Sequence, residues 1–146
     1  SGVIRHYVIT LILVLGVGLA GAPRSALAQS APEIDNRVEA TIAAQLEAFR
    51  AQDISRAWSH ASPLIQNLFG DQDQFARMVE LGYPMVWNPL TYRFGAARVT
   101  QTGVFQQVEV IDRDGQSHLL IYEMVEIAGD WRVNGVHYLP QPPASV

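Results

Sequence analysis

The sequence predicts an α+β fold in which N-terminal helices pack on a curved antiparallel sheet, preceded by a signal or anchor helix. Three observations lead to this prediction. Apolar residues recur at helical spacing between Ile34 and Val79, and they alternate with polar residues from Leu90 onward. Two hairpin signals divide the second half of the chain. Because the helices precede the strands, we expect them to cover one face of the sheet.

Residues 1–28 have the pattern of an export signal. Arg5 and His6 precede an apolar run over residues 7–22, and residues 26–28 form an A-x-A cleavage pattern. The run is shorter than the roughly 20 residues that span a bilayer comfortably, so we expect a cleaved signal peptide. The alternative is an uncleaved membrane anchor. Both interpretations predict a periplasmic domain, soluble or anchored to the inner membrane.

The composition suits one domain over residues 29–140, followed by a C-terminal tail over residues 141–146. The ten basic residues are all arginine, against fourteen acidic residues, and the net charge is −4. An acidic chain without a basic cluster is a poor nucleic-acid binder. The chain has no cysteine, which excludes disulfides, thiolate zinc sites and cysteine nucleophiles.

A long first helix is predicted from a single apolar stripe. Ser30 and Glu33 have the spacing of a capping box, and the helix should end at Ala51 or Gln52. The stripe, which we expect in the core, consists of Ile34, Val38, Ile42, Leu46 and Phe49.

Three short helices should follow. Asp53 is a good N-cap for the first, and Ser62 with Pro63 starts the second. Gly70 can end the second helix, Asp71 can cap the third, and Gly82 can end the third.

The next segment should be extended, because Pro84 and Pro89 restrict the residues that precede them to extended conformations. The strands that follow are predicted over residues 90–94, 98–101, 104–111, 118–127 and 131–139. Residues 112–115 (DRDG) and 128–130 (AGD) are the hairpin signals.

The register of the last hairpin decides which side chains face the helices. A two-residue turn at Gly129 and Asp130 places Tyr122 opposite His137, and it suits a type II′ turn. A three-residue loop instead moves Trp131 to the face of Ile127. We favour the first register.

A curved sheet covered by helices can enclose an apolar ligand pocket. The alternative is that the same side chains fill the core, and in either case Phe49, Phe75 and Trp131 should belong to one core with Trp58. The predicted pocket residues are Trp58, His60, Met78, Tyr83, Trp87, Tyr122, Trp131 and His137.

No catalytic residue, metal ligand or cofactor site is assigned. No two histidines have the spacing of a metal site, and the chain has no nucleophile-elbow, P-loop or dinucleotide-binding motif. His60 or His137 would be the acid or base if the protein were an enzyme. The strand carboxylates of Glu109, Glu123 and Glu126 should be paired, with Arg98 and Arg132 as their expected mates.

The order of a long helix, short helices and a turned sheet ending in GDWRV (residues 129–133) resembles the NTF2-like (cystatin-like α+β cone) superfamily. Residues 34–139 also resemble a proteobacterial domain family of unknown function. The specific motifs are ASPLIQ at residues 61–66 and MVELGYP at residues 78–84. The resemblance implies a fold but no established activity.

Superfamily relatives include isomerases, dehydratases, polyketide cyclases and non-catalytic binding modules. The isomerases need a carboxylate base and an acidic donor in the cone. Tyr83 or Tyr122 could donate, but no predicted inward carboxylate is a convincing base. We therefore expect an exported, non-catalytic NTF2-like domain of unknown biological role that binds a small apolar ligand or a protein partner.

Two alternatives stay open. The first is an accessory subunit anchored to a membrane protein complex by the N-terminal helix. The second is an isomerase, dehydratase or cyclase that uses histidine and tyrosine in the cone. The resemblance also implies a homodimer formed through the outer sheet face.

Overall fold

The structure, a computed structural model, describes residues 33–140. The predicted signal over residues 1–28, the predicted cap Ser30 and the tail 141–146 lie outside these residues. The chain divides into two units, Ser1–Glu33 and Ile34–Val146, and every helix and strand described below belongs to the second. No helix within residues 33–140 is both long enough and apolar enough to cross a membrane.

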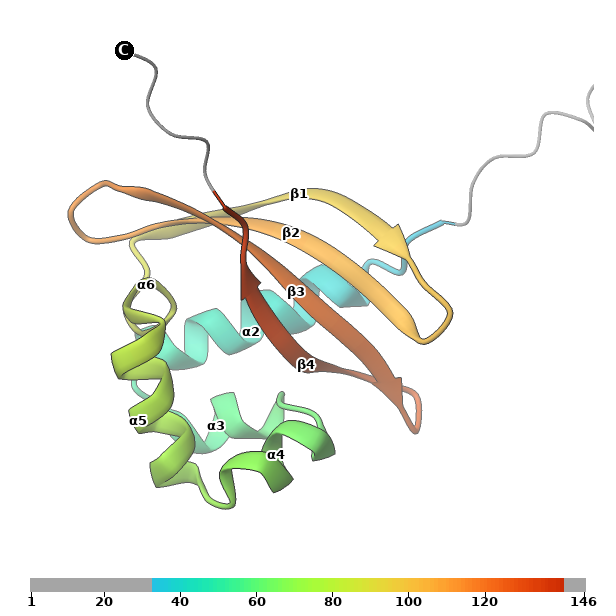
Figure 1. The fold of residues 1–146 in the computed structure, drawn as a ribbon, viewed down its shortest axis with the longest axis horizontal. Coiled ribbons are helices and arrows are strands. Elements are labelled where there is room, and N and C mark those ends of the chain that lie inside the picture. Colours follow the sequence, from blue (N-terminus) through green and yellow to red (C-terminus); the bar gives the residue numbers. More distant parts are fainter. Residues whose placement is uncertain (1–32, 141–146) are drawn as a thin grey trace, which may run out of the picture. The chain divides into compact units, whose positions relative to one another are not determined.

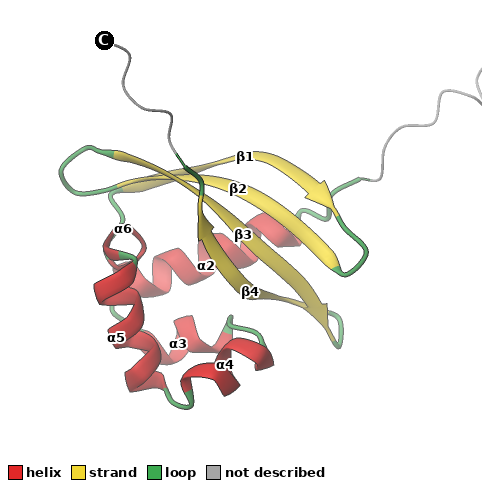
Figure 2. Ribbon diagram, in the orientation of Figure 1, coloured by secondary structure: helices red, strands yellow, loops and turns green. Residues whose placement is uncertain are grey.

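Helices come first and a four-stranded sheet follows, which confirms the predicted α+β class. The sheet is antiparallel with its strands in chain order, and the helices lie on one side of it (Figure 1, Figure 2). The helices are α2 (Arg37–Arg50), α3 (Ile54–Ser59), α4 (Pro63–Phe69), α5 (Gln72–Gly82) and α6 (Pro84–Trp87). The strands are β1 (Thr91–Val99), β2 (Gly103–Ile111), β3 (Ser117–Ile127) and β4 (Asp130–Tyr138).

Helix α2 buries four of the five residues of the predicted stripe and begins later than predicted, so that Ile34 lies before the helix and is only partly buried. Val38, Ile42, Leu46 and Phe49 are buried, and the helix ends at Arg50, one residue before the predicted end. Its first residue is Arg37, because the chain before it is held by other contacts. Asp35 Oδ1 accepts a hydrogen bond from Arg37 N (2.9 Å), and Asp35 Oδ2 accepts one from Trp131 Nε1 (3.1 Å). The predicted capping-box start was therefore wrong.

The predicted starts of α3, α4 and α5 are confirmed by side-chain caps. Asp53 Oδ1 accepts a hydrogen bond from Arg56 N (3.1 Å) at the start of α3. Ser62 Oγ accepts one from Ile65 N (3.3 Å) in α4, and Asp71 Oδ1 accepts one from Gln74 N (2.9 Å) in α5. Gly70 ends α4 with φ at +85°, a conformation that suits glycine. These helices start and stop where their local sequence dictates.

The prediction that the chain is extended around Trp87 was wrong. Pro84 occupies the first position of α6, and Met85 and Val86 are buried. A proline restricts the residue before it, and Tyr83 indeed has non-helical φ and ψ of −137° and 60°. The proline itself fits the first turn of a helix, so the restriction does not extend to the residues that follow.

Strand β1 joins two of the five predicted strands into one, so the sheet has four strands. The predicted segments 90–94 and 98–101 are the two ends of β1, which bulges between Phe94 and Ala97. Gln106, a fully buried residue of β2, donates from Nε2 to Gly95 O over 3.0 Å. This long-range bond holds the bulge, and the local signal for the bulge is Gly95, a glycine in the interior of the strand.

The β3–β4 hairpin differs from both predicted registers. Ile127 pairs with Asp130, so Ala128 and Gly129 form the two-residue turn. Their φ angles of +51° and +87° are those of a type I′ turn. Trp131 consequently lies opposite Glu126 rather than opposite Ala128.

A bulge in β4 changes the register a second time. Met124 pairs with Val133, but the next pair along the strands is Glu123 with Gly135, so Asn134 is an extra residue in β4. An extra residue moves the following side chains to the other face of the sheet. His137 therefore lies opposite Ile121, and the predicted pairing of His137 with Tyr122 was wrong.

One core joins the helices to the sheet, as predicted. Phe49 and Phe75 are buried, with ring centroids 5.8 Å apart, and the Trp58 ring lies 5.3 Å from that of Phe75. Trp131 packs against the same cluster.

The turn between α3 and α4 pairs with the free edge of β4. Val133 N donates to His60 O and Ser62 N donates to Val133 O, both over 2.8 Å. These two bonds hold the beginning of α4 against β4.

Candidate functional site

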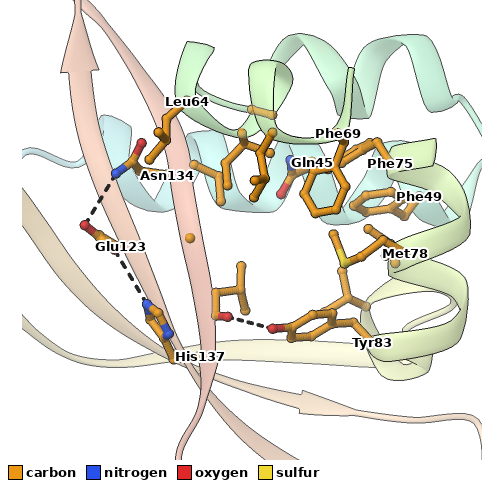
Figure 3. A pocket seen from close by; sticks show the side chains of 18 residues that line it. Gln45, Phe49, Leu64, Phe69, Phe75, Met78, Tyr83, Glu123, Asn134 and His137 are labelled. Atoms are coloured by element: carbon orange, nitrogen blue, oxygen red, sulfur yellow. Dashed lines mark hydrogen bonds and ion pairs between the residues drawn. The ribbon is translucent and has the colours of Figure 1, made fainter. Parts of the chain in front are cut away.

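A cavity of about 320 Å³ lies between α4, α5 and β4 (Figure 3). Small-molecule pockets in proteins are commonly about 300–1,000 Å³, so this volume suits a small ligand. Most of the lining is apolar. Its apolar side chains include Phe49, Leu64, Ile65, Leu68, Phe69, Phe75, Met78, Val79, Val86, Val133 and Val136.

Aromatic rings and a thioether form one end of the cavity. The Phe75 ring lies 5.8 Å from that of Phe49 and 6.2 Å from that of Phe69, and Met78 lies beside them (Figure 3). Phe75 and Phe49 are buried in the core, which fixes their positions. This end can accept only apolar groups without cost.

Tyr83 forms part of the wall with its hydroxyl already occupied. Tyr83 Oη donates to Val136 O over 2.8 Å, and the Tyr83 ring stacks on Tyr138 with centroids 5.0 Å apart. Burial raises the pKa of the Tyr83 hydroxyl. The group therefore fastens α5 and α6 to β4 and is a poor acidic donor toward a ligand.

Helix α4 forms an apolar, exposed rim on one side of the cavity. None of its residues is buried, and Leu64 and Leu68, which border the cavity, are 60% and 69% exposed. The segment between Ser62 and Gly70 carries no charged side chain. An apolar solute could therefore approach the cavity over this helix without displacing an ion pair.

Three polar side chains meet at the other end of the cavity. Asn134 Nδ2 donates to Glu123 Oε1 over 3.4 Å, and His137 Nε2 lies 3.5 Å from Glu123 Oε2 (Figure 3). Ser62 Oγ donates to Asn134 Oδ1 over 2.7 Å, which fixes the orientation of the Asn134 amide. Tyr122 and Met124 are buried under the helices, so Glu123, which lies between them in β3, points to the other face of the sheet, and its carboxylate borders the cavity only at the edge strand β4.

Gly135 leaves this polar end uncovered. A Cβ atom at Gly135 would lie 3.2 Å from Glu123 Oε2 and 3.4 Å from His137 Nε2. The second oxygen of the carboxylate lies 3.5 Å from His137 Nε2, and beside it there is space for a small group because Gly135 has no side chain.

The structure brings three of the eight predicted pocket residues to this cavity. Met78, Tyr83 and His137 line it. His60 and Trp131 instead border a separate, shallow cleft of about 510 Å³ formed by α2, α3 and β4. Burial lowers the pKa of His60, and the nearby Arg56 and Arg132 lower it further.

The other three predicted pocket residues are packing residues. The Trp58 ring lies 5.3 Å from that of Phe75, and the Trp87 ring lies 6.0 Å from that of Phe49. Tyr122 is fully buried, and its hydroxyl has no hydrogen-bond partner within residues 33–140. None of the three lines the cavity.

Sequence reasoning missed Glu123, Asn134 and Gly135 as cavity residues. They meet at the cavity because of the β4 bulge. A pattern signal existed: Asn and Gly are both unfavourable inside a strand, and a glycine there often marks a bulge or a close approach.

The expected mates of the strand carboxylates were wrong. Glu109 pairs with Arg93, Glu126 with Arg37, and Glu123 with His137. The expected mates have other contacts: Arg98 lies over the Phe105 ring at 5.4 Å, and Arg132 Nη1 donates to Ala61 O over 3.3 Å.

Acidic and histidine side chains do not gather into a metal site in the described part of the chain. Residues 33–140 contain no group of three or more His, Cys, Asp or Glu residues placed to hold a metal ion. The polar end of the cavity can offer hydrogen bonds and one carboxylate charge.

Residues 31–146 match the model of a family described as "Domain of unknown function (DUF4864)". No curated protein and no solved structure matches the chain. The match agrees with the predicted resemblance to a family of unknown function, while the NTF2-like relationship stays a prediction.

Proposed function

The chain belongs to the DUF4864 family, and from this premise we propose that it binds a small, mostly apolar molecule in the cavity between α4, α5 and β4 without converting it. The single observation that carries this proposal is the cavity itself, about 320 Å³ lined mainly by apolar side chains. A ligand there would bury its apolar surface, which is worth about 25 cal/mol per Å².

Packing supports a ligand over an unused space. Protein interiors are close-packed, and hollows larger than a water molecule are few and destabilising. The rings of Phe49 and Phe75 are held on their other sides by core contacts, and Tyr83 is held by its bond to Val136. These side chains cannot collapse inward without losing those contacts.

We propose in addition that the domain is exported to the periplasm and that it is an NTF2-like cone. The apolar run over residues 7–22 and the A-x-A pattern support export to the periplasm. Helices covering one face of an antiparallel sheet are consistent with an NTF2-like cone. A periplasmic binding domain would meet small apolar molecules crossing the envelope.

One observation favours a second candidate function, an isomerase, dehydratase or cyclase. His137 and Glu123 stand together at the polar end of the cavity, as an acid–base pair would. Binding accounts better for the site, because the His137 side chain is 61% exposed and the Tyr83 hydroxyl is bonded to Val136 O.

Isothermal titration of the full chain with octan-1-ol tests the proposed function. Ile65→Trp places a larger side chain on α4 at the cavity, and Leu81→Trp is the matched control on the 80% exposed surface of α5. We expect octanol to bind the wild type and Leu81→Trp, with at least about tenfold weaker binding to Ile65→Trp. No binding by a folded wild-type chain would refute the proposal.

A further inference from the structure

We propose that the ligand carries a primary ammonium group, which the Glu123 carboxylate binds at the Gly135 end of the cavity. This inference rests on the proposed function and names its ligand class: an aliphatic amine with its chain between α4 and α5. The juxtaposition that carries it is one carboxylate, uncovered at a glycine, at the polar end of an apolar cavity.

Glu123 lacks the arginine partner that neighbouring strand carboxylates have. Among the described residues, Glu109 is paired with Arg93 and Glu126 with Arg37, whereas the basic group within 4.0 Å of Glu123 is the His137 imidazole. An imidazole is charged only when protonated, so it does not neutralise a carboxylate as a guanidinium does.

The nearest arginines along the sheet have other contacts. Phe105 lies opposite Glu123 in the β2–β3 register, and Arg98 lies over the Phe105 ring. Arg132 donates to Ala61 O in the turn before α4. The carboxylate of Glu123 is therefore available to a cation from outside the chain.

The geometry around the carboxylate favours a compact head group. Asn134, itself held by Ser62, donates to Glu123 Oε1 and so fixes that oxygen. Glu123 Oε2 faces the space that a side chain on Gly135 would fill. A primary ammonium is a compact point charge with three N–H donors, which suits so small an opening.

An anionic head group would find no cation at the cavity. The lining contains no lysine or arginine, and an anion would stand beside Glu123. The net charge of −4 also favours the approach of cations over anions. A fatty acid is therefore a poor ligand for this site.

The expected preference is moderate, because the Glu123 side chain is 34% exposed and solvent screens part of its charge. Exposed charge pairs contribute little to binding, and an anionic head group would be disfavoured by a similarly small amount. We therefore expect octan-1-amine to bind about three- to tenfold more tightly than octanoate, with octan-1-ol between them.

The test is isothermal titration of the full chain with these three probes, which share one eight-carbon tail. Glu123→Gln should remove the preference for the amine over the alcohol while octanol still binds. Gly135→Ala should weaken amine binding, because its Cβ would lie 3.2 Å from Glu123 Oε2. Gly82→Ala is the matched control, since its Cβ would meet nothing within 4 Å.

The outcomes separate the two proposals. Equal binding of amine and alcohol by the wild type, or binding of octanoate as tight as that of the amine, overturns the ammonium site and leaves apolar binding intact. The ammonium site is likewise overturned if both Glu123→Gln and Gly135→Ala still bind the amine more tightly than the alcohol. Thermal unfolding transitions check that both variants are folded. Failure of all three probes to bind overturns the proposed function as well.

Discussion

Glu123 lies opposite Gly135 across β3 and β4, and this pairing exists because Asn134 is an extra residue in β4. Without the bulge, the alternation of side chains would leave Gly135 on the face that carries Val133. With it, Gly135 and His137 join the face of Glu123, which points away from the helices, and these residues border the cavity at the edge strand β4.

Asn134→Ala should destabilise the domain by about 1–2 kcal/mol, because it removes the bonds of the Asn134 amide to Ser62 Oγ and Glu123 Oε1. Urea denaturation measures the change. The control is Asn88→Ala, whose amide oxygen accepts only an exposed bond from Arg113 and should change stability by less than about 0.5 kcal/mol. Equal effects of the two substitutions would argue against the role of Asn134 in holding the bulge.

Gln106→Leu should destabilise the domain by about 0.5–1.5 kcal/mol, because it removes the hydrogen bonds that Gln106 Nε2 donates to Gly95 O and Ala96 O in the β1 bulge. The Gln106 side chain is fully buried, whereas Gly95 and Ala96 are exposed. Gln107→Leu, at the neighbouring and partly exposed position of β2, is the control. A Gln106→Leu variant as stable as the control would show that the bulge does not depend on this side chain.

The free energy of unfolding should fall in acid, because the stabilising contribution of the ionised Asp35 carboxylate is lost there. Hydrogen bonds from the Arg37 side chain and backbone, and then from Trp131 Nε1, hold the pKa of the Asp35 carboxyl well below its usual range. A lowered pKa in the folded state stabilises the fold above the unfolded-state pKa of about 3.9, and this contribution is lost as the pH falls through the folded value.

The measurement is the difference in thermal midpoint between the wild type and Asp35→Asn as a function of pH. The wild type should melt higher at pH 7, and the difference should narrow as the pH falls below about 4. The difference in thermal midpoint between the wild type and Arg37→Gln, which removes the partner of Asp35, should narrow over the same pH range. A difference that stays constant from pH 7 to pH 2 would contradict the assignment.

Gly103→Ala should destabilise the domain by more than about 2 kcal/mol, because a Cβ there would lie 1.9 Å from Met124 O and would force β2 and β3 apart. Gly82→Ala, which meets nothing within 4 Å at the end of α5, should be neutral or stabilising by up to about 1 kcal/mol. Chemical denaturation compares the two. A tolerated alanine at Gly103 would mean that the β2–β3 register differs from the one described.

Elements governed by local sequence were predicted well. Asp53, Ser62 and Asp71 cap their helices because each needs only an amide three residues further along. The α2 stripe and the DRDG hairpin also follow from neighbouring residues, and Asp112 Oδ1 does accept from Asp114 N and Gln116 N in that turn.

Features that depend on distant contacts were missed. The β1 bulge is held by Gln106 from the next strand, and the edge of β4 is held by the turn at His60 and Ser62. The candidate site shares this dependence. Its apolar members Met78 and Tyr83 were predicted from aromatic and apolar content, but Glu123 joins them only through a one-residue bulge that no periodicity encodes.

A crystal structure of the full chain grown with saturating octan-1-amine tests the central claim most directly. We predict an aliphatic chain between Phe75 and Met78 on one side and Leu64 on the other, with its nitrogen within hydrogen-bond distance of Glu123 Oε2. A cavity filled by the chain's own side chains, with no amine bound in it, would contradict the claim that this domain holds a small apolar ligand.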